Sequence, residues 1–311
     1  MQVILHVGAH RTATTSFQGY LRRHVADLHG MGLTCWGPRL TRNGLFAGVQ
    51  PQPGASRQAA RRARGRILLR MQKAKWDTGA QTLLVTDENL LGAVGRNMRL
   101  GRFYDDVGTR VARYVGAFDG QVSEIVVGIR ALDMFWASSA AYATQRGYPA
   151  LSARKWERLA AAMRSWRDVI TDLACAAPDT RIRVLSFEHF VGRPDAQLAA
   201  MLERSVPADT RPQWLNRSPD RNAIAQTLMD RGAPIDIRAV GARWIPFSHE
   251  VQAEFREQMA DDMHWLISGA DGLATLTEDM GTSETGQIPP SALQPRGQDR
   301  DNEERRLAQH R

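Results

Sequence analysis

The order of its hydrophobic segments constrains this chain more than any other feature. Short apolar segments typical of buried strands alternate with longer segments typical of helices. Strands are predicted at 2–8, 82–86 and 124–130, and a fourth strand that runs into a turn is predicted over 182–190. Because they are apolar on both faces, we predict an α/β fold with three layers, in which a mostly parallel central sheet carries helices on both faces.

The intervening segments are predicted to be helical, apart from a loop over 37–56. Ligands of such sheets bind at the carboxyl ends of the strands, so the residues that follow each strand are the first candidates for a site. The predicted helices span 16–30, 57–76, 102–117, 131–145, 153–176, 194–205, 220–231 and 248–268.

The sequence changes character near its C-terminal end. From about residue 278 it is polar, contains three prolines and has almost no core-forming residues. Such a composition cannot bury enough apolar surface to offset the cost of ordering the chain. We predict one domain over 1–277 and a disordered tail over 278–311.

Composition bounds the partners and the compartment. The net charge of +8 favours anionic partners. No apolar stretch is long enough to span a membrane, and the N-terminal residues lack the basic region of a signal peptide. The two cysteines, Cys35 and Cys175, cannot form a disulfide framework and lie in no recognisable nucleophile motif. We therefore expect a soluble, cytoplasmic protein.

The loop after the first predicted strand, residues 8–16, has the features of an anion site. Glycine allows a sharp turn, and the free N–H groups at the start of the next helix attract negative charge. Arg11 adds a permanent positive charge and a bidentate donor. A capped helix start without a ligand is the alternative. Hydroxyl groups are contributed by Thr12, Thr14, Thr15 and Ser16.

The loop matches the P-loop of nucleoside triphosphatases poorly. When Gly8 is aligned with the first glycine of G-x-x-x-x-G-K-[ST], Ala13 takes the second glycine position and Thr14 takes the lysine position. Only Thr15 fits. A phosphoryl-transferring kinase therefore stays a rival interpretation that lacks its lysine.

The same loop resembles the 5′-phosphosulfate-binding loop of bacterial sulfotransferases, whose pattern is roughly His-x-Gly-x-Pro-Lys-Thr-Gly-Thr-Thr-Ser-x-Gln. The departures are His10 for proline, Arg11 for lysine and Ala13 for glycine. Lysine occurs only at positions 73, 75 and 155, so an arginine in its place is weak evidence of lost function. The residues that agree are His6, Gly8, Thr12, Thr14, Thr15, Ser16 and Gln18.

A second segment, 125–142, resembles the 3′-phosphate motif of the same family. That motif is a strand that ends in arginine, followed by a helix with a serine eight residues later, and Arg130 and Ser138 have this spacing. Ser139 is the neighbour that could be confused with Ser138. A salt bridge from Arg130 to Asp133 is the alternative role. Weaker similarities extend the resemblance over residues 2 to about 200 and imply a P-loop nucleoside-triphosphatase-like fold.

The resemblance implies transfer of a sulfuryl group from 3′-phosphoadenosine 5′-phosphosulfate (PAPS) to a hydroxyl or amine of an unknown acceptor. No metal is expected. Arg11 would stabilise the charge that develops on the departing phosphate. A non-catalytic PAPS-binding or nucleotide-binding protein of the same fold is the alternative. The residues implied to bind the donor are Gly8, His10, Arg11, Thr12, Ala13, Thr14, Thr15, Ser16, Arg130 and Ser138.

The preferred general base is Glu88, which follows the second predicted strand. A carboxylate in a partly dry cleft is expected to have its pKa raised toward neutrality. His10 is the rival base, and the alternative is that Asp87 or Glu88 caps the next helix. Glu188 is expected to be structural, holding loops by hydrogen bonds.

The remaining features bear on the acceptor and on partners. Residues 57–76 are rich in arginine and lysine and contain no acidic residue. Three interpretations are open: a solvated helix face, a border of the cleft for an anionic acceptor, or a surface that lies on anionic lipid. Binding of nucleic acid is disfavoured because no recognition motif accompanies the charge. Residues 216–221 are a candidate cover for the nucleotide. The acceptor pocket or the core is expected to hold Trp36, Trp136, Trp156 and Trp166.

Overall fold

The computed structural model describes residues 1–50, 57–162, 164–211, 214–232, 239–240 and 243–277. All of them belong to one compact unit, Met1–Asp279. The predicted tail at 278–311 lies outside the described residues. Within the described ranges, no helix is both long enough and apolar enough to cross a membrane.

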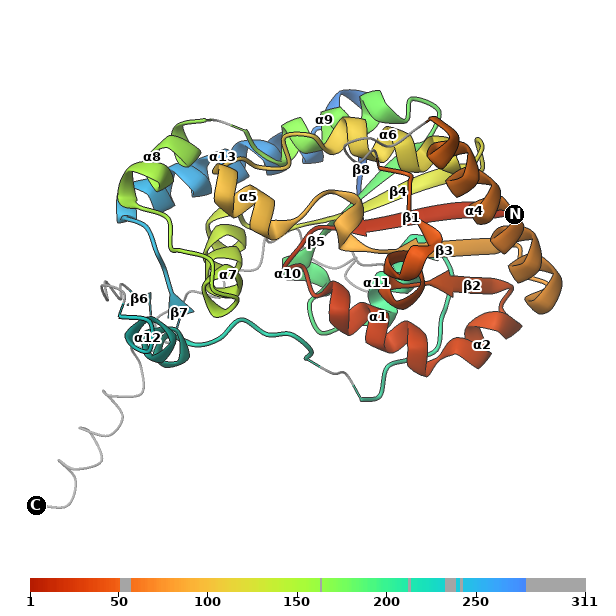
Figure 1. Cartoon of the computed structure of the whole chain (residues 1–311), viewed down its shortest axis with the longest axis horizontal. Helices are drawn as coiled ribbons and strands as arrows, with labels where there is room; N and C mark the ends of the chain where they lie inside the picture. The colour runs from red at the N-terminus through yellow and green to blue at the C-terminus, as the bar shows by residue number, and fades with distance from the viewer. Residues whose placement is uncertain (51–56, 163, 212–213, 233–238, 241–242, 278–311) are drawn as a thin grey trace, which may run out of the picture. The chain divides into compact units, whose positions relative to one another are not determined.

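The centre of this unit is a six-stranded sheet in which every neighbouring pair of strands is parallel (Figure 1). The strand order is β2-β3-β1-β4-β5-β8. The predicted α/β class with a parallel sheet is therefore confirmed. The strands are β1 (Gln2–Gly8), β2 (Leu33–Trp36), β3 (Thr82–Thr86), β4 (Val122–Ile129), β5 (Arg181–Ser186) and β8 (Thr275–Thr277).

Alternate residues of the strands enter two separate cores, one on each face of the sheet. Ile4 and Val126 pack with helices α1 (Thr14–Arg23), α2 (Val25–Gly30) and α11 (Pro194–Leu202). Leu5 and Ile125 belong to the larger core on the other face. This core includes α4 (Arg57–Thr78), α6 (Val107–Ala117), α9 (Trp166–Ala176) and α13 (His249–Ile267).

The strand arrows in Figure 1 point toward the carboxyl edge of the sheet, and several of the shorter elements follow the strands there. An antiparallel pair of two-residue strands, β6 (Ala239–Val240) and β7 (Arg243–Trp244), is separate from the main sheet. The other elements are α3 (Pro38–Leu40), η1 (Thr41–Leu45), η2 (Glu88–Leu90), α5 (Val94–Leu100), α7 (Leu132–Gln145), α8 (Ala153–Ala161), α10 (Phe187–Phe190), α12 (Arg221–Met229) and η3 (Ala270–Gly272).

Four local predictions need correction. The helix predicted over 102–117 begins only at Val107. The helix predicted over 153–176 is two helices, α8 and α9, because Ser165 and Asp168 form a capping box that starts α9. The helix predicted over 16–30 starts at Thr14 and is interrupted at His24. Residues 37–56, predicted as loop, contain the short helices α3 and η1 in their described part, 37–50.

The strand order places the ends of β1 and β4 side by side where the winding of the chain reverses. From β1 the chain continues to β2 on one side of the sheet, whereas from β4 it continues to β5 on the other. Such a switch point leaves a crevice at the carboxyl ends of the two strands, because their connections diverge. The loops that carry Arg11 and Arg130 both start there.

Candidate functional site

The loop from Gly8 to Ala13 is built on left-handed backbone. Gly8, Arg11 and Ala13 have φ of 63°, 66° and 62°. A Cβ at Gly8 would lie 2.5 Å from Cγ2 of Thr14, so only glycine fits. Arg11 and Ala13 adopt a conformation that costs an L-residue roughly 1–2 kcal/mol each. Turns of this kind orient successive N–H groups toward one point and form concavities for anions.

The predicted hydroxyl donors have different roles. Thr12 closes the loop on itself: its hydroxyl donates to the carbonyl of Ala9 at 2.7 Å and accepts from the Ala9 N–H at 3.2 Å. Thr14 is buried. Ser16 Oγ accepts from the N–H of Leu215 at 3.0 Å. Thr15, at the start of α1, makes no hydrogen bond through its hydroxyl to the described part of the chain.

Arg11 reaches across the crevice. Its Nε donates to Ser138 Oγ at 2.9 Å, and its Nη2 donates to the carbonyl of Asn216 at 3.1 Å and to Ser218 Oγ at 3.0 Å. Ser138 and Ser218 also contact each other through their hydroxyl oxygens, at 2.5 Å. Burial lowers the pKa of Arg11. No carboxylate among the described residues forms an ion pair with this guanidinium.

Arg130 is buried, with 7% of its surface exposed, yet it too has no acidic partner in the described ranges. Its Nη1 donates to the carbonyl of Arg11 at 2.8 Å, and its guanidinium lies 4.3 Å from the centre of the Phe187 ring. Its Nε is buried without a hydrogen-bond partner. Burial lowers the pKa of Arg130 to about 10; the charges of Arg243 and Arg11 add to this effect, whereas those of Glu188 and Asp133 oppose it. Arg130 therefore remains a cation at neutral pH.

The alternative role of Arg130, a salt bridge to Asp133, is wrong. Asp133 instead accepts hydrogen bonds from Arg256 Nε at 2.9 Å and Gln252 Nε2 at 3.0 Å. The backbone of Arg130 is fixed from another side, because Trp166 Nε1 donates to its carbonyl at 2.8 Å. A buried guanidinium that is held in place without an ion-paired carboxylate is suited to an anionic ligand.

The two residues of the second segment, Arg130 and Ser138, each contact Arg11 of the first loop. Ser138 contacts Arg11, whose carbonyl is bound by Arg130. Ser139 points into the protein, where its hydroxyl is buried without a partner. Ser138 is therefore the serine that faces the loop.

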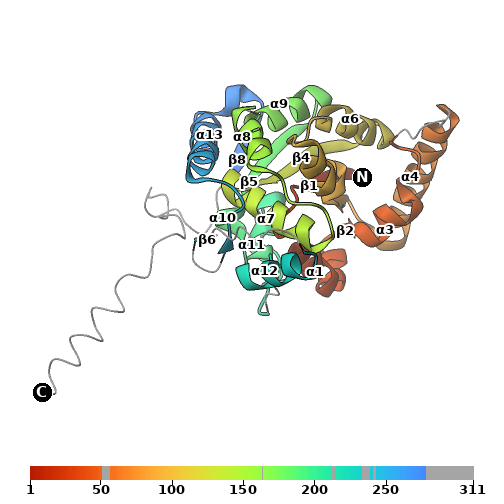
Figure 2. The same ribbon diagram turned by 60° about the vertical axis from the view of Figure 1, so that its left-hand side comes forward.

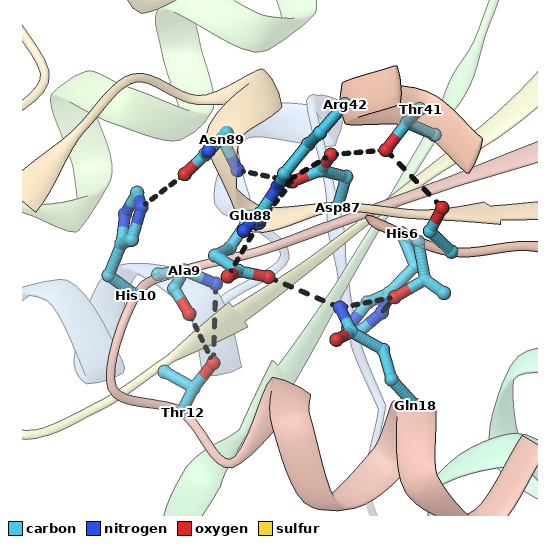
Figure 3. A network of polar contacts seen from close by, with 12 residues as sticks. His6, Ala9, His10, Thr12, Gln18, Thr41, Arg42, Asp87, Glu88 and Asn89 are labelled. Atoms are coloured by element: carbon cyan, nitrogen blue, oxygen red, sulfur yellow. Dashed lines mark hydrogen bonds and ion pairs between the residues drawn. The ribbon is translucent and has the colours of Figure 1, made fainter. Parts of the chain in front are cut away.

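Glu88 follows β3 and points toward the loop of β1 (Figure 3). Its carboxylate accepts from Arg42 Nη2 at 2.8 Å and from Gln18 Nε2 at 3.2 Å. Burial disfavours the charged carboxylate, but the hydrogen bond and charge of Arg42 outweigh burial and hold the pKa of Glu88 below its ordinary value. The expected rise of this pKa toward neutrality is therefore wrong, because the sequence gives no sign that Arg42 pairs with Glu88.

Asp87 has the capping role that was left open for one of these two acids. Its carboxylate accepts from the N–H of Asn89 at 3.0 Å and so caps η2. It also accepts from Thr41 Oγ1 at 2.5 Å and from Arg42 Nη2 at 2.6 Å. Arg42 therefore bridges both acids. No local sequence pattern marks it, because it reaches them from a segment more than 40 residues earlier.

The imidazole of His10 has a partner at each ring nitrogen. Nδ1 lies 2.8 Å from the hydroxyl of Tyr104, and Nε2 lies 3.1 Å from Oδ1 of Asn89. The Tyr104 hydroxyl accepts from the N–H of His10, so it donates to Nδ1, and Nε2 carries the proton. Burial lowers the pKa of His10 despite the nearby charge of Glu88. With both nitrogens engaged, His10 is a weaker candidate base than Glu88.

Three further predictions concern Glu188, the cysteines and the tryptophans. Glu188 is structural: it accepts from the N–H of Ala131 at 3.0 Å and from Ser186 Oγ at 3.0 Å. Cys35 and Cys175 are free, and burial raises the pKa of the Cys35 thiol to about 12. The core holds the four tryptophans named above, Trp36, Trp136, Trp156 and Trp166, each at most 3% exposed.

A cavity of about 270 Å³ lies beside the acids that follow β3. Two arginines, Arg42 and Arg110, contribute to its wall together with two aromatic rings, Phe46 and Tyr114. Sequence reasoning did not find this cavity, because its wall combines segments from η1, η2 and α6. The remaining lining residues are Thr41, Gly44, Ala47, Asp87, Asn89 and Leu90.

The described residues contain no group of three or more His, Cys, Asp or Glu side chains placed to hold a metal ion. Searches of protein-family models, of curated proteins and of solved structures found no match to this chain.

Proposed function

We propose that this protein binds PAPS and transfers its sulfuryl group to an acceptor. The observation that carries the proposal is the pair Arg11 and Arg130, two largely buried cations without an acidic partner in the described chain, at the switch point of a parallel sheet. Such cations are stabilised when an anion binds. Their positions also fit the two phosphate motifs that the sequence resembles.

The donor carries negative charge at two places, the 5′-phosphosulfate and the 3′-phosphate. The 5′ group would occupy the loop from Gly8 to Ser16, at the start of α1, which also supports a P-loop type of fold. The 3′-phosphate would be bound by Arg130, whose Nε has no hydrogen-bond partner among the described residues. Ser138 would contribute its hydroxyl beside the 5′ group, because it contacts Arg11.

The chemistry of the transfer requires a cation at the departing oxygen and a base at the acceptor. The acceptor oxygen or nitrogen forms a bond to sulfur, and the bond from sulfur to the bridging phosphate oxygen breaks, leaving its electron pair on the phosphate. Arg11 would stabilise that charge without donating its proton. Glu88 would accept the proton of the acceptor, because it is the carboxylate that faces the loop and stays ionised at neutral pH.

The segment that includes Asn216 and Ser218 would cover the bound donor. It contacts Arg11 and Ser138 directly. This supports the assignment of 216–221 as the cover. The acceptor would bind in the cavity beside Asp87 and Asn89, where Arg110, which has no ion-paired carboxylate among the described residues, favours an acceptor that carries negative charge.

One observation favours the alternative function, binding of PAPS or a related nucleotide without turnover. Glu88 is held by an ion pair with Arg42, which lowers its strength as a base. Binding and turnover therefore need separate measurements.

The test is equilibrium binding of labelled PAPS to the full chain, compared with Arg11→Ala, Arg130→Ala and the control Arg154→Ala on the exposed surface of α8. We expect binding to the wild type and the control, with a loss of at least about tenfold in each site variant. Absence of PAPS binding by the wild type would overturn the proposal. PAPS consumption with a panel of hydroxyl and amine acceptors then separates a sulfotransferase from a protein that only binds.

A further inference from the structure

Helix α4 presents an outward face that combines exposed apolar side chains with positive charge. Its inward face is buried through Ala63, Ile67 and Met71. On the opposite side, Leu69 is 68% exposed and Trp76 is 91% exposed. These two residues are seven positions apart, which is two helical turns, so they lie on one face. Figure 2 shows α4 along one border of the ordered unit.

Basic residues surround this apolar pair. Arg62, Arg66 and Lys73 are three, four or seven positions from Leu69 and are its neighbours on the helix surface. Arg66 donates to the carbonyls of Leu45 and Ala47. Lys73 pairs with Asp77, the one acidic residue of α4.

Four cations of α4, Arg62 among them, have no acidic partner within the described ranges of the chain. They all lie on exposed parts of the helix, so their charge is directed at solvent. They are Arg61, Arg62, Arg70 and Lys75.

We propose that this face of α4 is a docking surface for a membrane that contains anionic lipid. Trp76 and Leu69 would enter the boundary between headgroups and acyl chains, and the basic residues around them would bind lipid phosphates. The surface is separate from the crevice of Arg11 and Arg130, so the inference does not depend on the proposed function.

The composition of the face favours lipid over two other partners, nucleic acid and a second copy of the chain. A nucleic-acid backbone would use the cations but leave an exposed tryptophan and leucine at their centre without a role. A second copy of the chain would bring arginines against arginines, because a symmetric contact pairs the same surface with itself. The area that two apolar side chains can bury is also far smaller than the roughly 800 Å² that each partner buries in a stable interface.

The test is co-sedimentation of the full chain with vesicles of phosphatidylcholine alone and of phosphatidylcholine with phosphatidylserine. We expect binding only to the vesicles that contain phosphatidylserine, and weaker binding as salt rises. The double variant Arg62→Gln with Arg70→Gln should bind about 25-fold more weakly, roughly fivefold for each cation. Leu69→Ser with Trp76→Ala should also lose binding.

Matched controls are Arg154→Gln with Arg158→Gln, which removes the same charge from the exposed surface of α8, and Ile267→Ser, which removes an exposed apolar side chain from α13. Thermal unfolding checks that every variant is folded. Equal binding to both kinds of vesicle, or equal loss in the α8 control, would overturn the proposal. The proposal would also be overturned if the wild type formed a dimer that the Leu69 and Trp76 variant abolished. A wild type that bound a DNA duplex more tightly than vesicles, with full DNA binding kept in that variant, would overturn it as well.

Discussion

Arg130 is the residue on which the account depends most. A buried guanidinium normally has a carboxylate beside it, as Arg183 has in Glu124 and Glu203 at 2.7 and 2.6 Å. Both arginines are 7% exposed. Arg130 instead faces Arg11 and carries an Nε without a partner in the described structure, so it adds little to the stability of the free protein.

This contrast predicts opposite effects on folding. We expect Arg130→Met to leave the free energy of unfolding within about 1 kcal/mol of the wild type or to raise it, because the variant removes a buried charge that forms no ion pair with a described carboxylate. Arg183→Met should lower it by about 3 kcal/mol, because the buried Glu124 then keeps only the exposed Arg181, at 3.8 Å. Denaturant titration measures both, and a large loss for Arg130→Met would mean that its role is structural.

The loop residue Ala13 stores strain that glycine would release. At φ 62° a Cβ is unfavourable, so Ala13→Gly should raise the free energy of unfolding by about 1 kcal/mol. Ala9→Gly is the control within the same loop. Ala9 is buried and has no positive φ, and its replacement should lower stability by a similar amount. Destabilisation by Ala13→Gly would show that the methyl group has a packing role.

The ion pair between Arg42 and Glu88 predicts a pH dependence. The folded pKa of Glu88 is depressed, so this pair stabilises the fold above the ordinary carboxyl pKa and the stabilisation is lost as pH falls through the folded pKa. We expect the carboxyl signal of Glu88, followed by NMR, to titrate below pH 4.5 in the wild type and at higher pH in Arg42→Met. Arg39→Met, in the same segment, should leave the titration unchanged. An identical titration in Arg42→Met would remove Arg42 as the cause.

At the scale of elements, the long and strongly apolar segments were predictable and the short ones were not. Strands β1, β3, β4 and β5 follow from their apolar runs, whereas β2 has four residues and β8 has three, too few for a periodic signal. The break between α8 and α9 had a local signal, the Ser165 and Asp168 capping pair. Arg42 had none, since its role depends on the packing of η1 against η2.

The start of α9 is predicted to depend on Asp262 of α13. This buried carboxylate accepts from Ser165 Oγ at 2.6 Å, Trp166 N at 2.9 Å and Arg167 N at 3.2 Å. Asp262→Ala should lower the free energy of unfolding by roughly 3 kcal/mol, because buried donors lose their acceptor. Asp261→Ala, at the exposed neighbouring position, should change it by less than about 0.5 kcal/mol. Equal effects in denaturant titration would refute the role of Asp262.

At the scale of the whole molecule, the strand order of the sheet brings the two motifs together. The loops after β1 and β4 are 119 residues apart where Arg130 binds the carbonyl of Arg11, and they meet because β1 and β4 are neighbours in the sheet. The sequence allowed the two motifs to be recognised and their proximity to be expected. It could not predict that Arg42 would hold Glu88 or that residues 216–218 would contact Arg11, because both depend on long-range packing.

The most direct test of the central claim compares two ligands by calorimetric titration: 3′-phosphoadenosine 5′-phosphate and 5′-AMP, which lacks the 3′-phosphate. If Arg130 binds that phosphate, the wild type should prefer the first ligand by on the order of 100-fold, the value of one or two charge-assisted hydrogen bonds. In Arg130→Met the preference should fall to nearly one, with 5′-AMP affinity unchanged. Equal affinity of the wild type for both ligands, or an undiminished preference in Arg130→Met, would contradict the account.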